Sequence, residues 1–124
     1  MRISFDFDGT LDDYFDNHPN VRKNEIRDLA KRYILENHDV CILTRRYDTD
    51  NESNKVYRLA KELGIKNVYF TNRSMKFPFI INLGIEKHFD DCEYEIDLIN
   101  RSCAEQSHVC LTVHVEDKNW IKLI

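Results

Sequence analysis

The chain has 124 residues, of which 42% are hydrophobic and 32% are charged, and its formal net charge is −4. A chain of this size predicts a single globular domain, residues 1–124, with one core. The acidic balance argues against non-specific coating of nucleic acid, which needs a broadly basic surface, although local recognition of a phosphate group stays open.

Two features predict a cytoplasmic protein without a membrane partner. The first predicted strand begins at residue 2, which leaves no room for a signal peptide, and no apolar run is long enough to span a membrane. The cysteines show neither a CxxC pair nor zinc-like spacing, so we interpret all of them as reduced, structural thiols. They are Cys41, Cys92, Cys103 and Cys110.

The first predicted element is a short strand, in which Ile3, Phe5 and Phe7 alternate with polar residues. Asp6 and Asp8 are two positions apart, so we expect both carboxylates on the same side of its exit. Buried carboxylates are costly without a partner, and a hard cation such as Mg²⁺ is their natural partner. The alternative is an Asx-type turn with solvated acids.

Helices and strands alternate along the rest of the chain. A polar loop over residues 11–19 precedes a predicted helix that has Asn20 as its N-cap and ends near residue 38. The continuous apolar run over 40–43 is typical of a parallel strand covered on both faces. The remaining predicted elements are a helix over 51–63, a strand over 67–70, a helix over 75–83 with Pro78 in its first turn, a strand over 88–90, a helix over 93–103, a strand over 109–115, and an edge strand or packed tail from residue 120.

This alternation predicts a three-layer α/β/α sandwich with a Rossmann-like parallel sheet of about five strands. Ligands in such folds bind outside the carboxyl ends of the strands, so the polar residues at those ends are candidate functional residues. They are Asp6 and Asp8 after the first strand, Thr44, Arg45 and Arg46 after the second, Arg73 and Lys76 after the third, and Asp90 and Asp91 after the fourth.

Each of these residues alone has a plain structural explanation. Thr44 could cap a turn, Lys76 could be solvated, and the two acids at 90–91 could cap the following helix. Their joint placement at one rim of one sheet is the feature that favours a functional site.

The order of these residues resembles the pattern of the haloacid dehalogenase-like (HAD) hydrolases. The string DFDGTL at residues 6–11 matches the first motif of that family, and a threonine, a lysine and a pair of aspartates follow in the family's order. The resemblance extends from residue 3 to about residue 100. It implies a small phosphatase, a phosphoric monoester hydrolase that depends on Mg²⁺.

The resemblance also implies roles for individual residues. Asp6 would be the nucleophile that forms an aspartyl-phosphate, and Asp8 would be the general acid and base. Thr44 would bind the phosphoryl oxygens, and Lys76, or Arg73 in its place, would neutralise charge on the nucleophile. The metal ligands implied are Asp6, Asp8 and either Asp90 or Asp91.

The chain has no room for the cap domains that the family inserts. We therefore expect an open site, covered at most by the loop over 11–19 or by another subunit of a homo-oligomer. An open site suits nucleotides, nucleic-acid ends or phosphoproteins, and Arg45, Arg46 and Arg73 could contact additional phosphates. The alternative is that these arginines are solvated loop charges.

A second hypothesis belongs to a different class of protein. The same scaffold could serve as a non-catalytic module that binds phosphorylated ligands, or as a receiver-like signalling domain. Receivers, however, carry their phospho-accepting aspartate on a later strand than the acidic pair, and the third strand here ends in Thr71 and Asn72.

Overall fold

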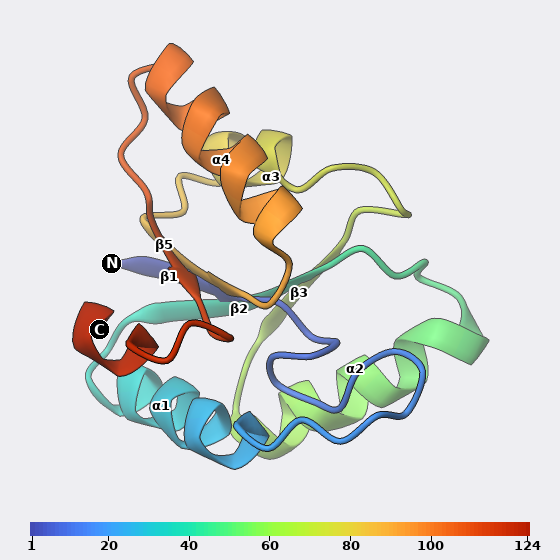
Figure 1. Cartoon of the computed structure of the whole chain (residues 1–124). Helices are drawn as coiled ribbons and strands as arrows, with labels where there is room; N and C mark the ends of the chain where they lie inside the picture. Colours follow the sequence, from blue (N-terminus) through green and yellow to red (C-terminus); the bar gives the residue numbers. More distant parts are fainter.

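The computed structural model describes the backbone of residues 1–124 and every side chain except that of Leu123. Five strands alternate with four α-helices, and a short 3₁₀ helix follows the last strand (Figure 1). In chain order the elements are β1 (Arg2–Phe5), α1 (Lys23–Leu35), β2 (Asp39–Thr44), α2 (Asp50–Leu63), β3 (Asn67–Phe70), α3 (Phe77–Asn82), β4 (Lys87–Asp90), α4 (Glu93–Glu105), β5 (Leu111–His114) and η1 (Trp120–Leu123).

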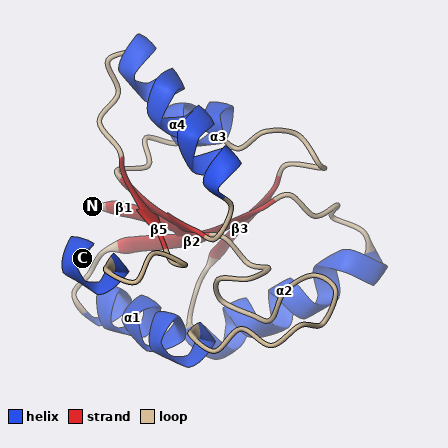
Figure 2. Ribbon diagram, in the orientation of Figure 1, coloured by secondary structure: helices blue, strands red, loops and turns tan.

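The strands form one sheet in the order β3-β2-β1-β4-β5, and every neighbouring pair is parallel. Helices α1 and α2 cover one face of the sheet, and α3 and α4 cover the other (Figure 2). The predicted three-layer sandwich with five parallel strands is therefore confirmed. Strand β1 lies at the centre, where Phe5 pairs with Ile42 on one side and with Phe89 on the other.

Each face of the sheet has its own apolar cluster. On the side of α1 and α2, the rings of Phe5 and Phe89 stack with centroids 4.5 Å apart, and η1 contributes the buried Trp120. On the other side, Cys41 and Leu43 of β2 belong to the cluster that includes residues of α3 and α4. The four cysteines are free thiols, as expected.

The start of the first helix and the tail of the chain can be compared with their predictions. Asn20 is not the N-cap of α1, because the helix begins later, after Arg22. The Asn20 amide is buried and donates instead to the carbonyls of Thr10 and Asp12, so it fastens the loop over 11–19. Of the two predicted alternatives for the tail, the packed one is confirmed: the tail is a short 3₁₀ helix with Trp120 in the core.

Two further points concern the helices. Pro78 lies in the first turn of α3, as predicted, where its missing N–H leaves no helical hydrogen bond unmade. Within the described part of the chain, none of the helices combines the length and the apolar character that crossing a membrane requires.

Candidate active site

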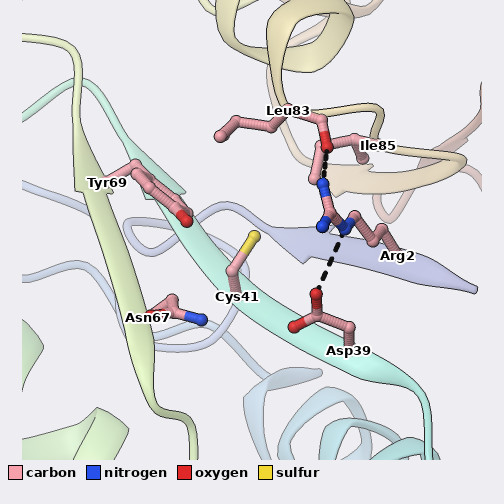
Figure 3. A pocket seen from close by; sticks show the side chains of 7 residues that line it. All are labelled: Arg2, Asp39, Cys41, Asn67, Tyr69, Leu83 and Ile85. Carbon is pink, nitrogen blue, oxygen red and sulfur yellow. Dashed lines mark hydrogen bonds and ion pairs between the residues drawn. The ribbon is translucent and has the colours of Figure 1, made fainter.

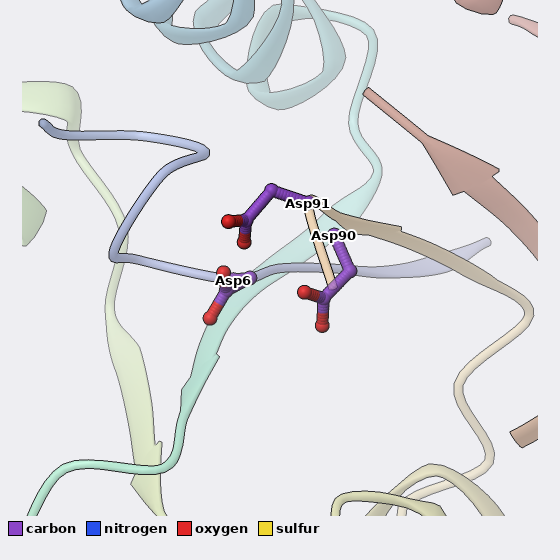
Figure 4. A group of neighbouring side chains, drawn as sticks. All are labelled: Asp6, Asp90 and Asp91. Carbon is purple, nitrogen blue, oxygen red and sulfur yellow. The ribbon is translucent and has the colours of Figure 1, made fainter. Parts of the chain in front are cut away.

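The carboxyl ends of two neighbouring strands bring three aspartates together. Asp6 follows the last residue of β1, and Asp90 and Asp91 stand at the end of β4, the strand beside it. Figure 4 shows the three side chains converging from these two strands. One carboxylate oxygen of each lies within 4.8 Å of the others. The fold therefore brings these acidic residues together at one edge of the sheet. We call the three residues the aspartate cluster.

Lys76 connects two members of this cluster. Its side chain is buried, and Nζ donates to Asp6 Oδ1 at 2.8 Å and to Asp90 Oδ2 at 2.6 Å. Burial alone would lower the pKa of Lys76, but the charges of Asp6 and Asp90 outweigh it and raise the pKa above the ordinary value. Lys76 is therefore a permanent cation between the two strand ends. Arg73, the alternative for this position, does not contact the cluster and pairs with Glu52 instead.

Asp6 is a buried member of the aspartate cluster. Burial, together with the nearby charge of Asp90, raises the pKa of Asp6 well above its ordinary value. Its other oxygen, Oδ2, accepts a hydrogen bond from Thr10 Oγ1 at 3.3 Å. The cluster has three carboxylates, and Lys76 pairs with two of them, which leaves an excess of negative charge when all three are ionised. The atoms that these three aspartates offer to a metal ion are all carboxylate oxygens, so the residues present fit a hard cation such as Mg²⁺.

Asp90 differs from Asp91 in how its oxygens are used. Oδ2 accepts from Lys76 and from His88, and Oδ1 accepts from the backbone N–H of Cys92 at 3.0 Å. Burial would raise the pKa of Asp90, but Lys76 and His88 hold it below its ordinary value. The Asp91 carboxylate lies beside Gly9 and has fewer hydrogen-bond partners, so it is the better placed of the two to bind a cation.

A buried pair behind Asp90 was not predicted from the sequence. His88 Nε2 lies 2.8 Å from Asp90 Oδ2, and its Nδ1 lies 2.6 Å from Ser4 Oγ. Because the carboxylate is an acceptor, Nε2 carries the proton and Ser4 donates to Nδ1. Burial lowers the pKa of His88, which agrees with a neutral ring. The available signal was that Ser4 and His88 are polar residues inside two apolar strands, and they turn out to be paired in register.

The Asp8 carboxylate lies apart from the aspartate cluster. Strand β1 ends at Phe5, so Asp8 belongs to the turn and the alternation of a strand no longer sets its direction. It forms a bidentate ion pair with Arg46, with Nε at 2.9 Å and Nη2 at 2.7 Å from the two carboxylate oxygens. Arg46 thereby fixes Asp8 at the margin of the cluster.

The other predicted rim residues are close to one another but already have partners. Thr44 is buried at the end of β2, and its hydroxyl accepts from the backbone N–H of Arg46. Arg45 donates to the carbonyl of Arg73 at 2.6 Å and lies 3.7 Å from the carboxylate of Glu95. Thus each of the three predicted rim arginines lies beside an acidic side chain, at Asp8, Glu52 or Glu95.

A cavity of about 260 Å³ lies elsewhere in the molecule (Figure 3). Its lining includes Arg2 and Asp39, the first residues of β1 and β2, so it opens at the amino ends of these strands. The two charged groups pair with each other at 3.2 Å. Burial raises the pKa of the Cys41 thiol beside them to about 12, so this thiol is not a thiolate nucleophile at neutral pH.

Comparison with known proteins identifies no relative: no protein-family model, no curated protein and no solved structure matches this chain. The interpretation of the site therefore depends on its residues and their geometry.

Proposed function

We propose that the protein is a Mg²⁺-dependent phosphomonoesterase of the HAD type that works through an aspartyl-phosphate on Asp6. The observation that carries this proposal is the buried Lys76, whose Nζ binds both Asp6 and Asp90 at adjoining strand ends. A lysine in this position restrains a carboxylate nucleophile and also offers positive charge where a phosphoryl group would approach.

The proposed reaction has two displacement steps. In the first, an Asp6 oxygen attacks phosphorus, the bond from phosphorus to the leaving oxygen breaks, and Asp8 in its protonated form gives that oxygen a proton. In the second, Asp8 takes a proton from water, the water oxygen attacks phosphorus, and the bond to Asp6 breaks. Asp6 is regenerated and inorganic phosphate is released.

Arg46 and Thr44 support these steps from the end of β2. The bidentate pair with Arg46 holds Asp8 in the turn in its ionised form, which suits its role as base in the second step. For the first step Asp8 has to leave this pair and take up a proton. Thr44 lies at the same edge of the sheet as Asp6 because β2 is the neighbour of β1. Its hydroxyl is a donor for the phosphoryl oxygens once it turns toward them.

Asp6 and Asp91 would hold the Mg²⁺ ion, and Asp90 would border it. The hydrogen bonds from Lys76, His88 and Cys92 occupy Asp90, whereas Asp91 is freer to bind a cation. A bound Mg²⁺ supplies positive charge that shields the anionic phosphoryl group from the carboxylate nucleophile.

The strand order weighs against the receiver-like alternative. Flavodoxin-like receiver domains have the order 2-1-3-4-5, whereas this sheet has the order β3-β2-β1-β4-β5. A non-catalytic module that binds phosphorylated ligands has the same site requirements as the enzyme, and turnover distinguishes the two.

The test is hydrolysis of p-nitrophenyl phosphate with and without Mg²⁺. We expect phosphate release to require the metal and to vanish in Asp6→Asn, while Asp39→Asn, an acid at the opposite end of the sheet, keeps full activity. Undiminished activity in Asp6→Asn would remove the nucleophile from the proposal. If beryllium fluoride with Mg²⁺ stabilises the protein but no phosphate ester is hydrolysed, the binding module is the correct interpretation.

A further inference from the structure

Aromatic rings and guanidinium groups alternate beside the candidate site. Tyr47 and Phe15 lie 5.2 and 5.1 Å from the Arg73 guanidinium, and Phe15 and Phe7 lie 4.9 and 5.1 Å from that of Arg46, measured to the ring centroids. We call these five residues the stacked ladder. It begins in the buried core at Phe7 and ends at the surface, where Phe15 is 55% exposed and Tyr47 is 42% exposed.

Both arginines of the stacked ladder already have an acidic partner. Arg46 uses Nε and Nη2 on Asp8 and Nη1 on the carbonyl of Glu52, and Arg73 uses Nη2 on the carboxylate of Glu52. A second phosphate would have to compete with both acids for these groups. The exposed part of the ladder therefore consists of two aromatic rings and Arg73, whose charge is compensated by Glu52. The expectation that the arginines contact additional phosphates stays a prediction.

The ladder lies on the side where the leaving group must be. In the reaction proposed above, on which this inference depends, Asp8 gives its proton to the leaving oxygen. Asp8 is bonded to Arg46, and Arg46 lies against Phe15. A leaving group attached to that oxygen thus extends from Asp8 along the exposed edge of the stacked ladder.

We propose that the exposed rings of Phe15 and Tyr47 bind a nucleobase of the leaving group. The substrate is then a phosphomonoester that carries a base, either a nucleoside monophosphate or the phosphorylated end of a nucleic acid. Bases stack on aromatic side chains and on guanidinium planes whatever their sequence, which gives affinity without requiring a free charge. A substrate of this class needs no cap domain to enclose it.

The competing explanation is that the ladder only fastens the loop over 11–19 to the rim, with Phe15 held by Arg46 and Arg73. The two explanations differ in what the rings contribute to substrates with and without a base. Adenosine 5′-monophosphate and ribose 5-phosphate form a matched pair, since they share the phosphoester and the sugar and differ in the base.

The experiment compares kcat/KM for these two compounds in wild type, Phe15→Leu and Tyr47→Leu. Each leucine variant should lose roughly five- to thirtyfold on adenosine 5′-monophosphate and almost nothing on ribose 5-phosphate. Phe15→Tyr and Tyr47→Phe keep a ring and should keep the preference. Tyr57→Leu is the matched control, because Tyr57 is similarly exposed at 46% and packs on Phe70 outside the ladder.

Salt and binding measurements separate this proposal from its alternatives. The preference for the base should persist at 0.5 M NaCl, whereas a preference that depends on free arginine charge would decline. A 5′-phosphorylated oligonucleotide in the same assay shows whether nucleic-acid ends are preferred over mononucleotides, and either result is compatible with base stacking.

If the leucine variants leave the ratio of kcat/KM for the two compounds unchanged, the ladder only holds the loop, and the proposal is overturned. If the wild-type protein hydrolyses neither compound and also fails to hydrolyse p-nitrophenyl phosphate, the phosphatase proposal fails separately. Calorimetric titration of both compounds into wild type and Phe15→Leu then still decides whether the ladder binds the base.

Discussion

Gly9 is the residue at which backbone conformation and the aspartate cluster meet. Its φ of +75° lies in the left-handed region, and a Cβ built there would overlap the Asp91 carboxylate and come within 2.8 Å of Tyr14 Cδ1. Glycine is therefore required at this position for two reasons: the left-handed turn favours it, and the Asp91 carboxylate leaves no space for a Cβ.

We expect Gly9→Ala to weaken both the fold and the proposed Mg²⁺ site. The left-handed φ costs about 1 kcal/mol, and displacement of Asp91 should lower Mg²⁺ affinity about tenfold or more. Gly64→Ala is the matched control, since Gly64 has a φ of +82° with no atom within 4 Å of the added Cβ. Urea unfolding and Mg²⁺ titration of both variants provide the measurement. If Gly9→Ala binds Mg²⁺ as well as Gly64→Ala does, Asp91 is not a ligand.

His88 makes stability depend on pH in a direction that can be worked out. Burial lowers the pKa of His88 below its usual 6.5, so below about pH 6.5 the unfolded chain binds a proton that the folded chain does not. The stability associated with the neutral ring is complete above pH 6.5 and is lost as the pH falls below it, at up to about 1.4 kcal/mol per pH unit.

The measurement compares the free energies of unfolding of wild type and His88→Gln between pH 8 and pH 5. The other titrating groups are common to both proteins and largely cancel in the difference. We expect a constant advantage of wild type above pH 7 that shrinks as the pH falls through 6.5. A difference independent of pH would mean that His88 is protonated equally in both states.

At the scale of elements, the side-chain amide of Asn20 connects two points at the base of the loop over 11–19. The Asn20 side chain donates to the carbonyls of Thr10 at 3.0 Å and of Asp12 at 3.1 Å, on either side of Leu11. Leu11 is fully buried, and its carbonyl accepts from Arg27 of α1. The base of the loop is thus ordered by Asn20 and Arg27, two residues that follow the loop in the sequence.

Replacing Asn20 with alanine should leave two buried carbonyls without their partner. We expect a loss of roughly 1–3 kcal/mol in the free energy of unfolding and faster proteolysis within residues 12–19. Asn24→Ala is the control, because Asn24 is exposed on α1 and should change stability by less than about 0.5 kcal/mol. Equal behaviour of the two variants would mean that the loop is held by its other contacts.

The helices and strands were largely predictable because the signals for them are local in the sequence. These signals are the periodicity of apolar residues and a glycine at the end of a helix. Gly64 ends α2 in the left-handed conformation, directly after the predicted helix over 51–63. Asn20 was misassigned because an asparagine before a helix is usually its cap, and only the folded loop offers it two better acceptors.

At the scale of the whole molecule, the order of strand ends predicted which acids would meet. Asp6 and Asp90 come together because β1 and β4 are neighbours, and a parallel sheet aligns their carboxyl ends. The partners of the arginines were not predictable. Arg46 with Asp8 and Arg73 with Glu52 depend on loop paths that no periodic pattern describes, so charges expected to be free are neutralised.

The central place of β1 in the sheet also has a consequence for the order of folding. Ile3 precedes both of its strand partners in the chain, Val40 on one side and Lys87 on the other. Until β4 has left the ribosome, one edge of β1 stays open to other chains. The same event that closes this edge delivers Asp90 to Lys76. The pairing of β4 with β1 therefore has two effects on the nascent chain. It covers the open edge of β1, and it completes the candidate site.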